Sequence, residues 1–142
     1  LHKDGYARYI RSYDERGNEI ETSCFGIDGK PTLHKNGYAR YIKSFDERGN
    51  KIGVSFFDID GNPTLHKNGY ARYTQSFDKR GNRIEQSYFG LDGKPINRNE
   101  GFARYVFQYD EINWGVAGKN KVIDKKFYDA LGNPVTLNQD WP

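Results

Sequence analysis

Near-identical units of 32 residues follow one another along most of this 142-residue chain. Residues 1–32 and 33–64 agree at 23 of 32 positions, and residues 65–96 repeat the same pattern. Residues 97–142 form a degenerate fourth copy with a seven-residue insertion. Repeats of this length stack supersecondary units whose apolar faces are covered by neighbouring units. The sequence therefore predicts one repeat array over residues 1–142, which acts as a surface or spacer.

Each unit contains two segments that are typical of β-strands. Residues 5–13 are rich in aromatic and β-branched types, and strand alternation gives them two faces. The face with Ala7, Tyr9, Arg11 and Tyr13 keeps its aromatic residues in every copy, so we expect it to be the inner one. The second strand is expected to run from Glu19 to Phe25. The predicted fold is an all-β antiparallel meander of about eight strands, in an elongated, twisted or spiral sheet.

A tight turn is predicted between the two strands of each unit. Its Asp favours a type I turn, and its Gly supplies the positive φ that the hairpin needs. These structural turn residues are Asp14 and Gly17, Asp46 and Gly49, and Asp78 and Gly81. Proline cannot donate a ladder hydrogen bond, so Pro31, Pro63 and Pro95 are expected to end the strand pairing of each unit.

The hairpin segments carry a resemblance to known repeats. Residues 12–20 read Ser-Tyr-Asp-Glu-Arg-Gly-Asn-Glu-Ile, and close variants stand at residues 44–52 and 76–84. This pattern resembles the Y-D-x-x-G-N-x-I core of bacterial YD (Rhs-type) repeats, although the Gly-Tyr-Ala-Arg-Tyr entry and Asp-Gly-x-Pro-Thr exit depart from that family. The alternating Gly-Asn and Asp-Gly hairpins are also similar to MORN-type repeats. Both resemblances imply an antiparallel β array without enzymatic activity.

The two resemblances imply different settings for the chain. YD repeats imply a secreted or cell-surface bacterial protein that builds shells or adheres. MORN repeats imply an intracellular scaffold that binds a protein partner or a membrane surface. The chain lacks methionine and begins with Leu1, so we expect it to be a fragment of a larger protein.

The fourth copy is expected to close the array. Atypical terminal copies often act as caps, and Trp114 and Trp141 are the residues expected to cover the last strand. A strand left uncovered could pair with another molecule, so edge-to-edge self-association is a further possibility.

Composition argues against several partners. The 22 basic and 19 acidic residues give a net charge of +3, spread over the four copies as about −1, +1, +3 and 0. Nucleic-acid binding requires basic residues clustered on one face, so we expect no nucleic-acid partner. No apolar run approaches the roughly 20 residues of a membrane-spanning helix. The single cysteine, Cys24, stands where other copies have aromatic residues, which indicates a packing role.

Neither a metal site nor a catalytic site is predicted. His2, His34 and His66 recur at the repeat period, which would place them roughly 9–10 Å apart, too far to share one zinc ion. We interpret them as packing residues. Asp58, Asp60 and Asn62 look like the start of a calcium loop, but the first and third copies have glycine in place of the first carboxylate. No nucleophile, base and orienting group can be assembled from the recurring residues, so no cofactor and no enzymatic activity are expected.

A repeated pair of aromatic and basic residues is the candidate binding surface. Strand alternation places both on one face, and the set comprises Tyr6, Arg8, Tyr38, Arg40, Tyr70, Arg72, Phe102 and Arg104. Two interpretations remain open. In the first, the arginines pack on neighbouring rings through cation–π contacts. Alternatively, the row is a platform for a protein or glycan ligand, since Tyr and Arg are enriched in binding hot spots.

Overall fold

The computed structural model describes residues 2–110 and 122–137, in which nine strands form one antiparallel sheet in sequence order. The strands are β1 (Arg8–Tyr13), β2 (Glu19–Phe25), β3 (Arg40–Phe45), β4 (Lys51–Phe57), β5 (Arg72–Phe77), β6 (Arg83–Phe89), β7 (Arg104–Tyr109), β8 (Val122–Tyr128) and β9 (Pro134–Val135). The predicted all-β meander is confirmed, with β9 as a short addition. These residues contain no helix, and hence none that could cross a membrane.

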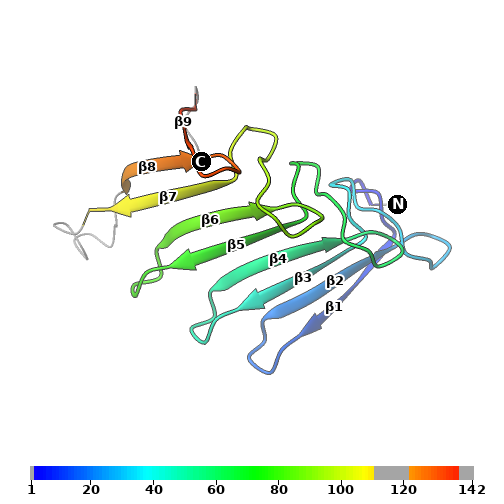
Figure 1. The fold of residues 1–142 in the computed structure, drawn as a ribbon. Helices are drawn as coiled ribbons and strands as arrows, with labels where there is room; N and C mark the ends of the chain where they lie inside the picture. Colours follow the sequence, from blue (N-terminus) through cyan, green and yellow to red (C-terminus); the bar gives the residue numbers. More distant parts are fainter. Residues whose placement is uncertain (1, 111–121, 138–142) are drawn as a thin grey trace.

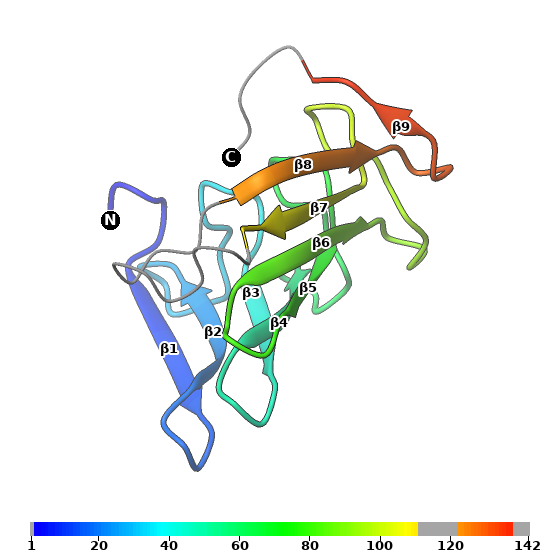
Figure 2. The same ribbon diagram turned by 90° about the vertical axis from the view of Figure 1, so that its left-hand side faces the viewer.

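The sheet is a single open ladder with different structures at its two ends (Figure 1). Short hairpin turns join the two strands of each of the first three repeats at one end, and the connectors between repeats gather at the other. Strand direction rotates progressively from β1 to β8 (Figure 2). This is the twist that β-sheets acquire from the chirality of their residues.

Pairing is more extensive within a repeat than between repeats. The β1–β2 hairpin pairs along six residues, from Arg8↔Phe25 to Tyr13↔Glu19, whereas β2 and β3 pair along three. The connectors add pairing between repeats, because each connector after the first donates one backbone hydrogen bond to the connector before it. These bonds run from Lys35 to Asp4 at 2.7 Å, from Lys67 to Asn36 at 2.8 Å, and from Asn99 to Asn68 at 2.9 Å.

The hairpin turns have the predicted chemistry. In the first turn, Oδ1 of Asp14 accepts hydrogen bonds from the backbone N–H groups of Arg16 and Asn18, each at 2.9 Å. Gly17 follows with a φ of +86°, and the equivalent Gly49 and Gly81 have φ values of +85° and +87°. The side-chain amide of Asn18, which donates a hydrogen bond to Oδ2, lowers the pKa of Asp14 together with these backbone hydrogen bonds. The turn is therefore set by Asp and Gly together.

Replacing Gly49 with Val should lower the free energy of unfolding by at least about 1 kcal/mol. The substitution forces a β-branched residue to a positive φ, although a Cβ there would meet no neighbouring atom within 4 Å. Urea unfolding would measure the change, with Gly49→Ala separating the cost of positive φ from that of β-branching. A midpoint unchanged in both variants would show that the turn tolerates another backbone conformation.

Core residues lie on one face of the sheet, which is the face predicted to be inner. Tyr88, Tyr105 and Phe102 are the largest fully buried side chains. Burial decreases toward β1, where Tyr9 is 44% exposed while the equivalent Tyr105 is 2% exposed. The sheet edge at β1 is therefore uncovered among the described residues, and edge-to-edge association there remains a prediction.

The fourth repeat keeps the repeat pattern in the part that is described. β9 pairs with the end of β8 through Tyr128↔Pro134, which corresponds to the bridges Phe25↔Pro31, Phe57↔Pro63 and Phe89↔Pro95 in the earlier copies. The prediction that these prolines end the pairing is therefore wrong, because each proline forms a bridge and the next residue continues the pairing, as in the backbone hydrogen bond from Thr32 to Cys24 at 3.0 Å. The capping residues Trp114 and Trp141 fall outside the described residues, so their role stays a prediction.

A candidate binding face of stacked rings

The recurring histidines and tyrosines form one column of stacked rings across the repeats. The column runs His2, Tyr6, His34, Tyr38, His66 and Tyr70, with centroid separations between neighbours of 4.8, 5.8, 4.9, 6.1 and 5.3 Å. Each interplanar angle is 23° or less. A tyrosine separates each histidine from the next, so no two imidazoles face a common ligand. We call this set the ring column.

Arg98 takes the histidine position of the fourth repeat and continues the ring column. Its guanidinium carbon lies 5.4 Å from the ring centroid of Tyr70 and 5.6 Å from that of Phe102. The side chain is 6% exposed and donates hydrogen bonds to both carboxylate oxygens of Glu100 and to the hydroxyl of Tyr88. A planar guanidinium thus replaces an imidazole between two rings.

His34 and His66 of the ring column are held in the neutral form. Nδ1 of His66 accepts a hydrogen bond from the backbone N–H of Asn68 at 3.1 Å, and Nδ1 of His34 accepts one from Asn36 at the same distance. Burial, together with the nearby charges of Lys67 and Arg98, lowers the pKa of His66 to about 4. Burial also lowers the pKa of His34, while Asp4 opposes the change. The packing role expected of these histidines matches their positions.

Stability should therefore fall as the pH decreases from about 7 to about 4. The unfolded chain protonates His66 near its ordinary pKa of about 6.5, while the folded chain resists protonation until about pH 4. We expect a loss of about 1–2 kcal/mol from this residue, allowing for its partial solvent exposure. Urea unfolding at pH 7, 5.5 and 4.5 would measure it. A His66→Phe variant should show a shallower pH dependence, and an equal slope in both proteins would contradict the assignment.

The predicted face of the aromatic and basic pairs is wrong for the aromatic members. Strand β3 begins only at Arg40, so alternation does not extend back to Tyr38. Tyr38 stacks on His34 and packs against Tyr41 and Phe56, on the inner face. Tyr6, Tyr70 and Phe102 likewise join the inner-face aromatic contacts. The rings and the arginines consequently lie on opposite faces.

The arginines form a separate row on the outer face. Arg8, Arg40, Arg72 and Arg104 place their guanidinium carbons 5.3, 4.9, 4.7 and 4.9 Å from the ring centroids of Phe25, Phe57, Phe89 and Tyr128. Each of these is the directly paired residue on the neighbouring strand. Arg40 and Arg104 also form ion pairs with Glu21 and Glu85, each at 3.2 Å. These contacts favour the packing interpretation of the row.

An open hollow of about 300 Å³ lies on the inner face near the middle of the sheet. Two lysines and a set of rings line it, and the lining residues are Tyr38, Tyr41, Lys43, Lys51, Val54, Phe56, His66, Tyr70 and Tyr73. The volume is at the lower limit of small-molecule sites, and apolar walls with few charged groups are typical of them. This central hollow is the strongest candidate binding site.

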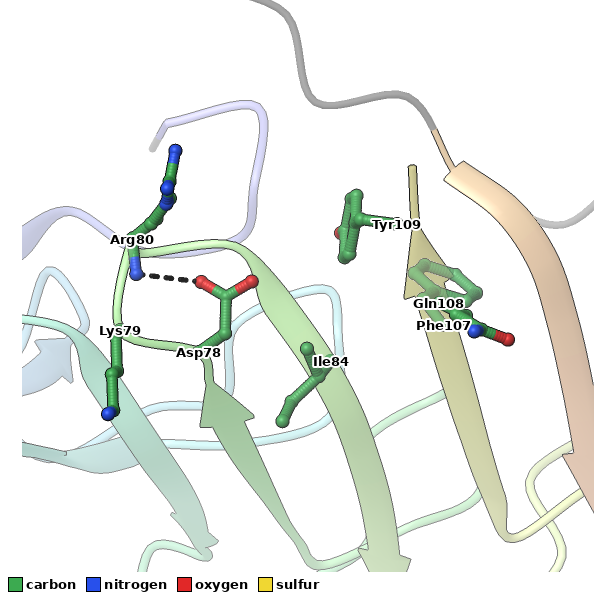
Figure 3. Close-up of a pocket in the computed structure, with 7 residues that line it drawn as sticks. All are labelled: Asp78, Lys79, Arg80, Ile84, Phe107, Gln108 and Tyr109. Atoms are coloured by element: carbon green, nitrogen blue, oxygen red, sulfur yellow. Dashed lines mark hydrogen bonds between the residues drawn. The ribbon is translucent and has the colours of Figure 1, made fainter. Parts of the chain in front are cut away.

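A second hollow, of about 330 Å³, lies beside the third hairpin turn (Figure 3). Ile84 and Tyr109 form part of its wall, next to the turn that begins at Asp78. Both carboxylate oxygens of Asp78 accept hydrogen bonds within that turn, from Arg80 and Asn82. The carboxylate of Asp78 therefore has a structural role in the turn.

Among the described residues, the calcium-like segment and Cys24 provide neither a metal site nor a reactive thiol. Within the described residues, no group of three or more His, Cys, Asp and Glu side chains could hold a metal ion. Asp58 accepts hydrogen bonds from the backbone N–H groups of Asp60 and Asn62, so the calcium-like segment is a turn. Cys24 is 3% exposed, and burial raises the pKa of its thiol. A buried protonated thiol is a packing residue.

Sequence reasoning named Tyr38 and Tyr70 as candidate binding residues but missed the two lysines of the central hollow. Lys43 and Lys51 carry no motif, and neither is repeated as lysine in every copy. The sequence did hold a signal at the first residue of the second strand, which is Glu19 in the first copy, Lys51 in the second and Arg83 in the third. Comparison of the chain with protein-family models and with curated proteins found no match.

Proposed function

We propose that this chain is a non-catalytic β-repeat module that offers its inner face as a binding surface. The central hollow supports the proposal most, because it combines exposed parts of aromatic rings with two cations on a rigid sheet. Its histidine is neutral and stacked between rings, which suits packing rather than proton transfer. Binding to a protein or glycan surface is the role that these features fit.

The resemblance to YD repeats places the proposed module in an exported or cell-surface bacterial protein. An antiparallel ladder of eight long strands would also serve there as a rigid spacer. A MORN-like intracellular scaffold that binds a protein partner or a membrane surface is the alternative setting. These roles differ in their ligands, so a binding experiment separates them.

A glycan array and anionic lipid vesicles, both probed with the whole chain, would test the binding role. Two variants assign any binding to a face: Tyr73→Ala at the hollow, and Arg72→Ala on the outer face. We expect glycan binding that Tyr73→Ala weakens at least tenfold and Arg72→Ala leaves unchanged. Vesicle binding alone would favour the scaffold, and loss only in Arg72→Ala would move the surface to the outer face. If the chain binds neither glycans nor vesicles, the proposed function is reduced to that of a spacer.

A further inference from the structure

The first residue of the second strand changes its charge along the array. This position is Glu19 in β2, Lys51 in β4 and Arg83 in β6, and each pairs with the last residue of the preceding strand. In all three repeats a tyrosine of the next repeat is its neighbour. Tyr41 donates a hydrogen bond to Glu19, while Lys51 and Arg83 lie over the rings of Tyr73 and Tyr105 at 5.6 Å.

The first repeat shows how this position accommodates an anion. The Glu19 carboxylate accepts hydrogen bonds from the hydroxyls of Thr22 and Tyr41. It also lies 3.3 Å from Nε of Arg11 and 3.3 Å from Nζ of Lys43. These contacts lower the pKa of Glu19 against the opposing effect of burial. A negative charge at this point in the repeat is thus bound by cations and hydroxyl groups.

The second repeat loses the anion and keeps one of the two neighbouring cations, Lys43, while Gln75 stands where the first repeat has its second cation. Strand β4, Lys-Ile-Gly-Val-Ser-Phe-Phe, contains no acidic residue, whereas β2 has two and β6 has one. Within residues 2–110 and 122–137, no carboxylate lies within ion-pair distance of Nζ of Lys51. Arg83 adds a further positive charge nearby, and burial together with Arg83 lowers the pKa of Lys51. The central hollow therefore has an excess of positive charge that Glu19 alone offsets.

From this arrangement we propose that the central hollow binds the carboxylate of a small ring compound, with Lys51 pairing to the carboxylate and Tyr73 stacking on the ring. The ligand carboxylate supplies the charge that Glu19 supplies in the first repeat. The inference rests on the proposed binding role of the inner face. It adds that the ligand is anionic and that Lys51 determines this preference.

The size and walls of the hollow limit the ligand to one ring. About 300 Å³ that is open to solvent suits a single aromatic or sugar ring better than a folded partner. Tyr73 is only partly buried, and Nζ of Lys51 lies over its ring at 5.6 Å. When Lys51 turns to pair with the ligand carboxylate, this face of Tyr73 becomes available for stacking. Lys43 is already paired with Glu19 at 3.3 Å, which makes Lys51 the principal anchor. An aromatic carboxylate and a sugar carboxylate share this chemistry.

NMR titration of the isotope-labelled chain would test the inference at constant pH and ionic strength. The probes are benzoate and glucuronate, with benzamide and glucose as their uncharged counterparts. We expect at least one acid to shift the backbone amide signals of Lys51, Val54 and Tyr73 and to saturate. Its uncharged counterpart should bind at least tenfold more weakly. Comparing benzoate with glucuronate distinguishes an aromatic from a sugar ligand.

Two variants with the same charge change identify the residue responsible. Lys51→Glu installs the residue that the first repeat has at this position, so it is compatible with the fold. It should weaken binding of the acid at least tenfold. Lys30→Glu makes the same change in an exposed turn and should leave binding unchanged.

Three outcomes would overturn the inference. Equal weakening in both variants would show that net charge, not Lys51, attracts the acid. Binding of the uncharged compounds at these amides with equal affinity would refute the anionic preference while leaving the inner face as a binding surface. If neither acid nor uncharged compound shifts these amides, the assignment of a ligand to the hollow is wrong.

Discussion

Replacing Phe102 with Ala should lower the free energy of unfolding by about 3–5 kcal/mol. The side chain is 0% exposed, and its ring lies against Tyr88, Tyr105 and Phe127 at centroid separations of 5.9, 6.2 and 5.1 Å. The described strands form a single sheet, and no second sheet among them can fill the space that the ring leaves. The substitution therefore weakens the contacts between the third and fourth repeats. Urea unfolding followed by tyrosine fluorescence would measure the change.

A matched control for this substitution is Leu131→Ala. Leu131 is 86% exposed in the last turn, so its truncation should change the unfolding free energy by less than about 0.5 kcal/mol. A Phe102→Ala loss below about 1 kcal/mol would mean that the stacked inner face is not the core of this protein.

The second large effect is expected for Arg98→Ala, at about 2–4 kcal/mol. The substitution removes the guanidinium from between Tyr70 and Phe102 and leaves the buried hydroxyl of Tyr88 without this donor. It also breaks the paired hydrogen bonds to Glu100, whose side chain is 32% exposed and can be solvated instead. Thermal and urea unfolding would both report the loss.

Arg98→His separates stacking from hydrogen bonding, because histidine occupies the equivalent position in the first three repeats. This variant should recover part of the stability that Arg98→Ala loses, through ring stacking alone. If His and Ala cost the same, the stack contributes nothing at this position and the stability comes from the hydrogen bonds to Glu100 and Tyr88.

The hairpins could be predicted because their determinants are local. Asp14 and Gly17 specify one turn through hydrogen bonds and a positive φ that involve only neighbouring residues, and the copies repeat both. The bounds Glu19–Phe25 of the second strand follow from the same signals. The order of strands follows from short connections between sequential neighbours.

The inner-face ring column could not be derived from strand alternation. Alternation applies only from Arg40 onward, whereas Tyr38 and Ala39 precede the strand and are positioned by connector hydrogen bonds, such as the one from His34 to the carbonyl of Tyr38. The connector therefore turns Tyr38 to the face opposite Arg40. Its recurrence with His34 four residues earlier was visible, but the stacking depends on how connectors from different repeats pack.

The central hollow was hidden for a different reason. A repeat comparison emphasises what recurs, and the hollow depends on what changes between copies. Lys51 differs from Glu19 in charge, and its significance appears only when Lys43, Tyr73 and Arg83 are placed around it by strands β3, β5 and β6. Divergence at one position of a regular scaffold thus creates a local site without changing the fold.

The inner face is a continuous stack of rings that holds His34 and His66 in the neutral form. The most direct measurement is the pH titration of the His66 side-chain signals by NMR. We expect His66 to titrate at about pH 4, because burial and the nearby positive charges lower its pKa. A midpoint near the ordinary value of about 6.5 would contradict the stacked column and the inner face built on it.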